Sequence, residues 1–341
     1  MTTTTAIEPE SAEHEIYTER ASRAERVAGF LQRQGAATLL IGLVVVAAAV
    51  FPNFRTYGNV TNILLQASGL GIIAVGMTCV IITGGIDLSV GSQYALGGVL
   101  GAWAAQYGFV TGALAPLLGC GLLGLVQGMF IGRFSMPPFI VTLAGLLGIR
   151  GLALWVTNEG RTIPKVEWES LFAAVGHTQT VGIAVPVYLA AVVFAAGWLF
   201  LRQAARGRSL YAIGGSESAA TLMGLPVART KVLVYTLSGV CAGLAGMLNA
   251  AYTISGVPTQ GVGWELDAIA AVVIGGTLLV GGSGSVLGTL AGVLLLKVIL
   301  NVINQVGSLD ASFQMVVSGA FLTVVVVIQA ILTRAQGLRE L

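Results

Sequence analysis

The stretch 60-VTNILLQASGLGIIAVGMTCVIIT-83 indicates the fold class, because 24 consecutive residues carry no charged side chain. About 20 predominantly apolar residues are the length that a helix needs to cross roughly 30 Å of hydrocarbon. We therefore expect a transmembrane helix here. Comparable windows occur on both sides of it, and ten can be placed along the chain. They cover residues 35–51, 60–83, 88–106, 112–132, 137–157, 182–202, 230–250, 265–281, 285–306 and 312–333.

The composition agrees with a protein that lies in a bilayer. Of the 341 residues, 55% are hydrophobic and 9% are charged, whereas soluble domains carry about 25% charged residues. The 47 glycines fall mainly inside apolar runs, where small residues allow membrane helices to pack closely. A net charge of +2 gives no electrostatic argument for binding nucleic acid. The expected fold class is all-α, a polytopic membrane protein with about ten transmembrane helices.

The distribution of Lys and Arg predicts the orientation of these helices. With a cytoplasmic N-terminus, twelve Lys and Arg residues near helix ends fall inside and three fall outside, as the positive-inside rule requires. Both termini are then cytoplasmic. The chain divides into an N-terminal extension at 1–34, a transmembrane domain at 35–333 and a short cytoplasmic tail at 334–341.

Four acidic residues lie near apolar windows, and all lie at predicted helix ends, where a solvated acid costs little. A charge near mid-membrane costs about 2.5–3.5 kcal/mol, so a buried Asp87 would need partners. Backbone amides freed by the neighbouring glycines, or an N-cap role for the following helix, would supply them. A direct substrate contact is the alternative interpretation. The four acids are Asp87, Glu265, Asp267 and Asp310.

The longest predicted cytoplasmic loop is 203-QAARGRSLYAIGGSESAATLMGLPVARTK-231, and it is too polar to cross a bilayer. Ser216 is suited to cap a short helix from Glu217 to Met223. Glycines punctuate the loop on both sides of that helix. A short helix bracketed by glycines can dock in a groove of another protein, and a plain connecting loop is the alternative.

This loop resembles the cytoplasmic loop that couples the permeases of ribose-type sugar ABC importers to their ATPase. Two further stretches resemble the other signatures of this family of binding-protein-dependent permeases. They are 76-GMTCVIITGGIDLSVGSQYALGG-98, which contains Asp87 and Ser89, and 263-GWELDAIAAVVIGGTLLVGGSGSVLGT-289, which contains Glu265 and Asp267. The three motifs occur in order, and the resemblance covers about residues 36–333.

The resemblance implies the translocation subunit of an importer for a pentose or hexose in a bacterial cytoplasmic membrane. Its implied partners are an ATP-binding subunit, an extracytoplasmic sugar-binding protein, a second permease copy or paralogue, and membrane lipid. The chain contains no GxxxxGK[ST] phosphate loop, so ATP and Mg are expected on the partner, with no cofactor and no enzymatic activity in this chain. The coupling loop spans about 203–229. The residues expected to dock the ATPase are Gly207, Arg208, Gly214, Gly215, Glu217, Ala220 and Gly224.

The residues that line the solute pathway are predicted in two groups. Lys297, Asn301 and Asn304 share one helix face, since their spacing is i, i+4 and i+7. A polar stripe of this kind faces protein or water rather than lipid, so it either lines the outer mouth of the pathway or joins two helices. The second group combines an aromatic ring with hydrogen-bonding groups, which suits sugars, and it consists of Phe139, Thr142 and Asn158.

Other functions stay open on the sequence alone. An ABC permease for branched-chain amino acids or nucleosides would share these features, because an external binding protein sets much of the specificity. An ion-coupled secondary transporter would usually need intramembrane carboxylates, and a membrane scaffold would need no coupling loop. A faint echo between residues 80–101 and 272–292, each with a Gly-Gly pair between apolar runs, hints at the internal repeats from which transporters are often built.

Overall fold

The computed structural model describes residues 23–306 and single positions at 313, 316, 319, 320, 323 and 327. Most of the window 312–333, the tail at 334–341 and the first 22 residues lie outside the described part. The first helix, α1 (Arg23–Val50), runs without a break across residue 34, where the predicted extension ends.

The described chain is almost entirely helical, as the apolar windows predict. Each of the first nine windows falls on a helix, and the only sheet in this part of the chain is a pair of two-residue antiparallel strands. After α1 the elements are η1 (Pro52–Arg55), α2 (Tyr57–Ile82), α3 (Val90–Ala105), α4 (Phe109–Gly132), α5 (Pro138–Val156), α6 (Leu171–His177), β1 (Gln179–Thr180), β2 (Ile183–Ala184), α7 (Val185–Gln203), α8 (Ala205–Gly215), α9 (Glu217–Leu222), α10 (Val227–Thr253), α11 (Trp264–Ile274) and α12 (Val286–Val306).

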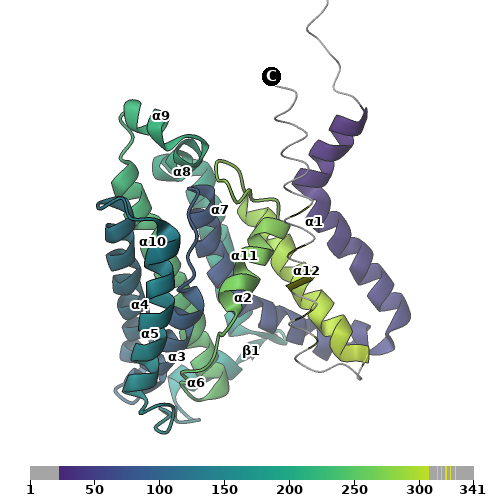
Figure 1. Cartoon of the computed structure of the whole chain (residues 1–341). Coiled ribbons are helices and arrows are strands. Elements are labelled where there is room, and N and C mark those ends of the chain that lie inside the picture. The colour runs from purple at the N-terminus through teal and green to yellow at the C-terminus, as the bar shows by residue number, and fades with distance from the viewer. Residues whose placement is uncertain are drawn as a thin grey trace, which may run out of the picture.

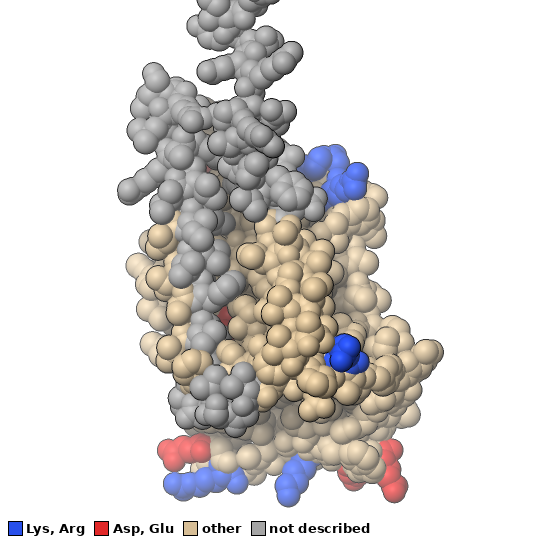
Figure 2. Space-filling model, turned by 90° about the vertical axis from the view of Figure 1, so that its right-hand side faces the viewer, with Lys and Arg blue, Asp and Glu red and all other residues tan. Residues whose placement is uncertain are grey.

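Six of the described helices are long and apolar enough to cross a membrane by length and composition. They are α2, α4, α5, α7, α10 and the Val286–Gln305 part of α12, and Gly35–Val50 of α1 is a shorter apolar helix. On the face seen in Figure 2, most charged side chains of the described residues lie toward the two ends, and the zone between them is mostly uncharged, with one basic side chain and a partly covered acidic one. The fold is therefore that of a helical membrane protein.

The helix α10 packs against α2, α3 and α4. Glycines permit this close approach. A Cβ atom at Gly124 or Gly128 of α4 would meet the backbone of Tyr235 or Val232 in α10. These glycines lie where helix backbones touch, as in other membrane bundles.

Two of the predicted helices are interrupted inside the bundle. The eighth window was expected to continue to residue 281, but α11 ends at Ile274. Gly275 and Gly276 follow, and Gly276 has φ +87°, a conformation that a helix cannot contain and that glycine adopts readily. A second break, Thr83–Ser89, separates α2 from α3.

The two breaks touch each other. The Gly282 amide donates to the Ile82 carbonyl oxygen at 2.9 Å, and Gly281 lies against the backbone of Gly84. The echoing stretches 80–101 and 272–292 thus both contain a helix, a break and another helix, and their breaks form one junction. In Figure 1, α8 and α9 lie at one end of the bundle, and α6 and β1 lie at the other.

Candidate functional site

The predicted coupling loop folds into two helices, α8 and α9. Ser216 is the N-cap of α9, and its Oγ accepts from the Ala219 amide at 3.2 Å, so the predicted cap is confirmed. Helix α8 was not predicted, because its glycines have low helix propensity. A signal was nevertheless present, since the buried residues Gly207, Leu210 and Ile213 recur every third position along one face.

Helix α8 rests directly on the junction of the two breaks. Gly214 packs against the Ile82 carbonyl and the Gly282 amide, and a Cβ there would collide with both. The Tyr211 hydroxyl donates to the Gly284 carbonyl oxygen at 3.1 Å. Burial raises the pKa of the Tyr211 phenol above its ordinary value, so it stays a donor at neutral pH. Any displacement of α8 must therefore act on both breaks.

The backbones of α7 and α8 are also in close contact at the corner between the two helices. Gly207 is buried against the backbone of Phe200 and Leu201. Arg208 is exposed, and its Nη1 donates to the Gln203 carbonyl oxygen at 3.0 Å, which is a favourable charge at the C-terminus of α7. The loop is thus joined to the bundle by a packed corner rather than by a loose linker.

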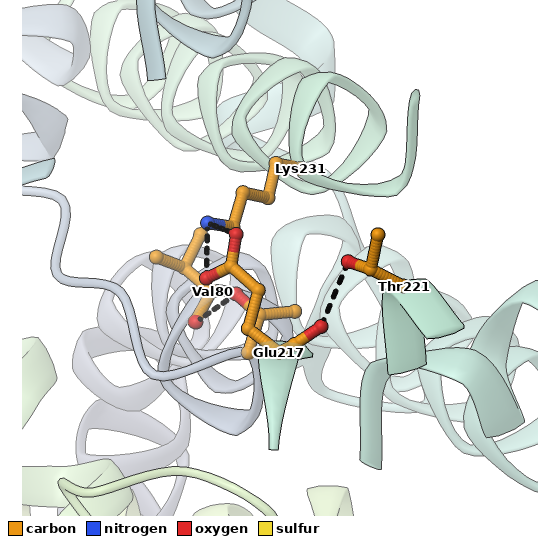
Figure 3. A network of polar contacts seen from close by, with 5 residues as sticks. Val80, Glu217, Thr221 and Lys231 are labelled. Atoms are coloured by element: carbon orange, nitrogen blue, oxygen red, sulfur yellow. Dashed lines mark hydrogen bonds and ion pairs between the residues drawn. The ribbon is translucent and has the colours of Figure 1, made fainter. Parts of the chain in front are cut away.

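Helix α9 is fastened to the start of α10 by an ion pair. The Lys231 Nζ lies 2.7 Å from both carboxylate oxygens of Glu217, and the Thr221 hydroxyl donates to the Glu217 carbonyl oxygen at 2.8 Å. Figure 3 shows this pair beside Val80, in the last turn of α2. An ion pair with a half-exposed partner contributes about 0–1 kcal/mol, so it orients α9 more than it stabilises the fold.

The predicted docking residues divide into two sets. Four lie at the surface, namely Arg208, Gly215, Glu217 and Gly224, and three lie inside the packing, namely Gly207, Gly214 and Ala220. Two exposed large hydrophobic side chains of the loop, Leu222 at 89% and Met223 at 67%, were not among the predicted docking residues. This apolar pair ends α9, next to Gly224 at φ +77°. A short helix with exposed apolar side chains can bind in a groove of another protein.

Asp87 is completely buried, so the expectation that it would be solvated is wrong. The chain leaves α2 at Thr83 in a turn, and the non-helical segment that follows contacts α4, α5 and α10, which places the carboxylate inside the protein. Its Oδ1 accepts from the Ser89 amide at 2.9 Å and from Ser89 Oγ at 2.6 Å, and Oδ2 accepts from Ser238 Oγ at 2.7 Å. The expected partners are wrong in detail, because the Gly84 and Gly85 amides bond to carbonyl oxygens of α2 and Ser89, not Asp87, is the N-cap of α3.

The break between α2 and α3 also receives side chains from three other helices. The Thr142 hydroxyl of α5 and the Tyr235 hydroxyl of α10 donate to the Ile86 carbonyl oxygen at 3.2 and 3.4 Å. Gln127 Oε1 of α4 accepts a hydrogen bond from Ser89 Oγ at 3.1 Å. The segment from Ile86 to Ser89 is therefore a buried polar hub that holds α3, α4, α5 and α10 together.

A cavity of about 260 Å³ lies toward the end of the bundle that carries α6 and β1. Residues of α2, α3, α7, α10, α11 and α12 line it, among them Tyr94, Trp264 and Lys297. The Tyr94 and Trp264 rings stack with centroids 4.4 Å apart, and Lys297 Nζ lies 5.4 Å from the centroid of the Trp264 ring. Of the predicted pathway residues, Lys297 is the one that lines this cavity.

The other members of the polar stripe lie elsewhere. Asn301 forms a reciprocal carboxamide pair with Asn59 of α2, with N–O distances of 2.8 and 3.1 Å. Of the two roles predicted for the polar stripe, pathway lining and helix joining, Asn301 therefore has the second. Asn304 is exposed on α12. Glu265 and Asp267 lie in the first turn of α11, as predicted, and Asp267 interacts electrostatically with Lys297.

The second predicted pathway group is not brought together around the cavity. Phe139 is 55% exposed on α5, whereas Thr142 is buried in the polar hub. Asn158 is exposed in the turn after α5, with φ +50°. Their role in a pathway stays a prediction.

The carboxamide pair gives a first test of the packing. We expect Asn301→Leu to lower the free energy of unfolding by about 0.6 kcal/mol and by at most about 1.7 kcal/mol, the mean and the maximum measured for hydrogen bonds between membrane helices. Unfolding of purified Asn301→Leu, Asn59→Leu and the double variant in mixed micelles measures it. Strictly additive losses in the double variant would contradict the pairing.

These features together define a polytopic membrane transport protein, with breaks inside the bundle and a protruding helical loop at one end. The chain belongs to the family described as "Branched-chain amino acid transport system / permease component", which matches residues 59–326. The resemblance found in the three sequence motifs is confirmed. The chain is accordingly a multi-pass permease of the bacterial inner membrane.

Curated relatives are similar over nearly their whole length. The ribose import permease protein RbsC of Escherichia coli K12 is 40% identical over 304 residues, which cover 88% of this chain and 94% of the relative. RbsC of Bacillus subtilis is 40% identical, covering 88% and 93%. The fructose import permease protein FruG of Bifidobacterium longum is 38% identical, covering 86% and 89%. No solved structure is significantly similar to the chain.

Proposed function

We propose that this permease is the translocation subunit of an ATP-driven importer for a monosaccharide, a pentose or hexose. The observation that carries the proposal is the pair of helices at one end of the bundle, of which α8 packs on both helix breaks and α9 carries the exposed Leu222 and Met223. The names of the relatives support the solute class, since they are import permeases for ribose and fructose.

The end that carries α8 and α9 is cytoplasmic in this proposal. Basic residues gather there, at Arg202, Arg206, Arg208 and Arg229, as the positive-inside rule requires. With α1, α3, α11 and the window 312–333 counted as membrane segments, the chain has about ten, and both termini lie in the cytoplasm.

The tip of α9 is proposed to dock the ATP-binding subunit. Leu222 and Met223 enter an apolar groove of that subunit, in the way that a short helix binds in a groove, while Glu217 and Arg208 provide the polar rim. ATP and Mg²⁺ are held by the partner, because this chain has no phosphate-loop motif.

Movement of the ATP-binding subunit then reaches the solute pathway through α8. A displaced α8 acts on Ile82 and Gly282 through Gly214, and on Gly284 through Tyr211. Ile82 is the last residue of α2, and Gly282 and Gly284 lie in the break before α12. Both α2 and α12 contribute side chains to the cavity. Alternating access results when the two breaks shift together and the cavity changes the side to which it opens.

The opposite end of the bundle is proposed to receive the solute from an extracytoplasmic binding protein. The loop from 158 to 181 lies there and presents Trp168, which is 64% exposed. A second copy of the chain, or a paralogue, completes the permease, as the family resemblance implies.

Uptake in the native host tests this function. We expect deletion of the chain to abolish uptake of labelled D-ribose or D-fructose. Uptake should stop when ATP is depleted and should survive brief treatment with a protonophore at constant ATP. Collapse with the ion gradient at constant ATP would indicate a secondary transporter, and loss of L-leucine uptake alone would move the solute class to amino acids.

A further inference from the structure

The cavity near α6 and β1 contains three carboxamides that neither the coupling loop nor the polar hub uses. Asn62 and Gln66 come from α2, and Asn249 comes from α10. We refer to them as the cavity carboxamides. In a membrane bundle a polar side chain is expected to have a partner, because lipid and apolar side chains offer none.

The cavity carboxamides are not satisfied by one another. Asn62 and Gln66 are exposed residues that line the cavity, and Gln66 Nε2 donates to Asn62 Oδ1 at 3.2 Å, a bond that uses neither the Gln66 oxygen nor the Asn62 nitrogen. The side chain of Asn249 makes no hydrogen bond in the described part of the chain, although it is half-buried. Donors and acceptors of the cavity wall are thus available to a solute.

The charge of the residues that line the cavity favours a neutral solute. Lys297 is the one charged residue that lines the cavity, and no carboxylate lines it in the described structure. An ammonium group of an amino acid would meet the like charge of Lys297 at the wall, and the nearby acid Asp267, which does not line the cavity, already interacts with Lys297. A neutral solute with several hydroxyl groups meets no such penalty, because each carboxamide both donates and accepts hydrogen bonds.

The shape of the cavity agrees with a single sugar ring. Its aromatic wall, formed by Tyr94, Tyr252 and Trp264, offers apolar surface to the C–H face of a ring. Its volume of about 260 Å³ lies just below the roughly 300–1,000 Å³ of pockets for drug-sized ligands. A solute smaller than a drug-sized ligand, such as one sugar ring, therefore suits this cavity.

We propose that this cavity is a solute-binding station within the permease, where Asn62, Gln66 and Asn249 select a neutral monosaccharide by its hydroxyl groups. This inference rests on the proposed import function and assigns part of the specificity to the permease itself. Binding is weak, since a station on a pathway must also release its solute.

Saturation-transfer NMR of the full chain in lipid nanodiscs tests the station without any partner subunit. D-ribose, D-fructose and L-leucine are the probes, each at millimolar concentration. We expect saturation transfer to a sugar in the wild type and in the control Gln106→Leu, which removes an exposed carboxamide at the end of α3. Asn249→Leu and Gln66→Leu should weaken the sugar signal about fivefold, the effect of one lost hydrogen bond. Thermal unfolding shows whether each variant is folded.

The outcomes separate this inference from the import function. An unchanged sugar signal in the folded cavity variants, or no sugar signal in the wild type, overturns the station even if sugar uptake requires the chain. An L-leucine signal that depends on Asn249 overturns the assigned solute class. A sugar signal that is lost in both cavity variants and kept in Gln106→Leu supports the station, whatever the uptake assay shows.

Discussion

Replacing Gly214 by valine is expected to abolish transport. The valine side chain would occupy the place of the Ile82 carbonyl and the Gly282 amide, so α8 could no longer rest on the junction of the two breaks. Overpacking of a well-packed site costs about 1–3 kcal/mol, and sometimes more. Because the contact is with backbone rather than with a flexible side chain, we expect uptake to fall by roughly a hundredfold, as 3 kcal/mol implies.

The initial rate of sugar uptake, normalised to the amount of chain in the membrane, measures this effect. Gly42→Ala is a control, because the space around Gly42 in α1 is open, and alanine at a helical glycine is neutral or stabilising. Gly214→Ala should fall between the two. Wild-type uptake by Gly214→Val would show that α8 does not transmit movement through this contact.

Replacing Asp87 by alanine is expected to cause the largest loss of stability. The Ser89 amide, the Ser89 hydroxyl and the Ser238 hydroxyl would each lose their acceptor inside the protein. A buried donor left without a partner costs about 1–3 kcal/mol, so several kcal/mol are removed and little folded chain should reach the membrane. Asp87→Asn keeps one oxygen for the Ser89 amide and is expected to be milder.

The yield of folded chain and its thermal unfolding in micelles measure the effect. Glu169→Ala is the matched control, because it removes an exposed carboxylate from the loop between α5 and α6. We expect the order of stability to be Glu169→Ala, then Asp87→Asn, then Asp87→Ala. Equal stability of Asp87→Ala and Glu169→Ala would show that the polar hub does not hold the bundle together.

The sequence predicts the helices well and their interruptions poorly, for a physical reason. An apolar window is recognised by its length and hydropathy, and α2, α4, α5, α7, α10 and α12 satisfy both. The run from Thr277 to Val280 is apolar too, yet it lies beyond the end of α11, since hydropathy does not register the positive φ of Gly276. The same limitation made Asp87 look like a solvated residue at a helix end.

The functional residues show which information the sequence lacks. The spacing of Lys297 and Asn301 places both on one face of α12, but only the assembled bundle shows that Lys297 meets a cavity and Asn301 meets Asn59. Asn249 and Gln66 were not selected because their neighbours come from other helices. In the coupling loop, a glycine at 214 and a glycine at 215 look alike in sequence. The first is packed against backbone, and the second faces open space.

The open space around Gly215 makes it the sharpest probe of docking. A large side chain there adds bulk to the outer surface of the loop and leaves the junction beneath α8 unchanged. Glu217→Lys acts differently, because it breaks the ion pair with Lys231 and reverses the charge beside the tip of α9. Neither substitution introduces a group into the membrane bundle.

The most direct test of the central claim is purification of the tagged chain from its native host in a mild detergent. We expect an ATP-binding subunit to co-purify with the wild type and to be lost with Gly215→Trp and with Glu217→Lys, while both variants remain folded in the membrane. Equal retention by the wild type and both variants, or no ATP-binding subunit with the wild type, would contradict the claim that α8 and α9 dock an ATPase.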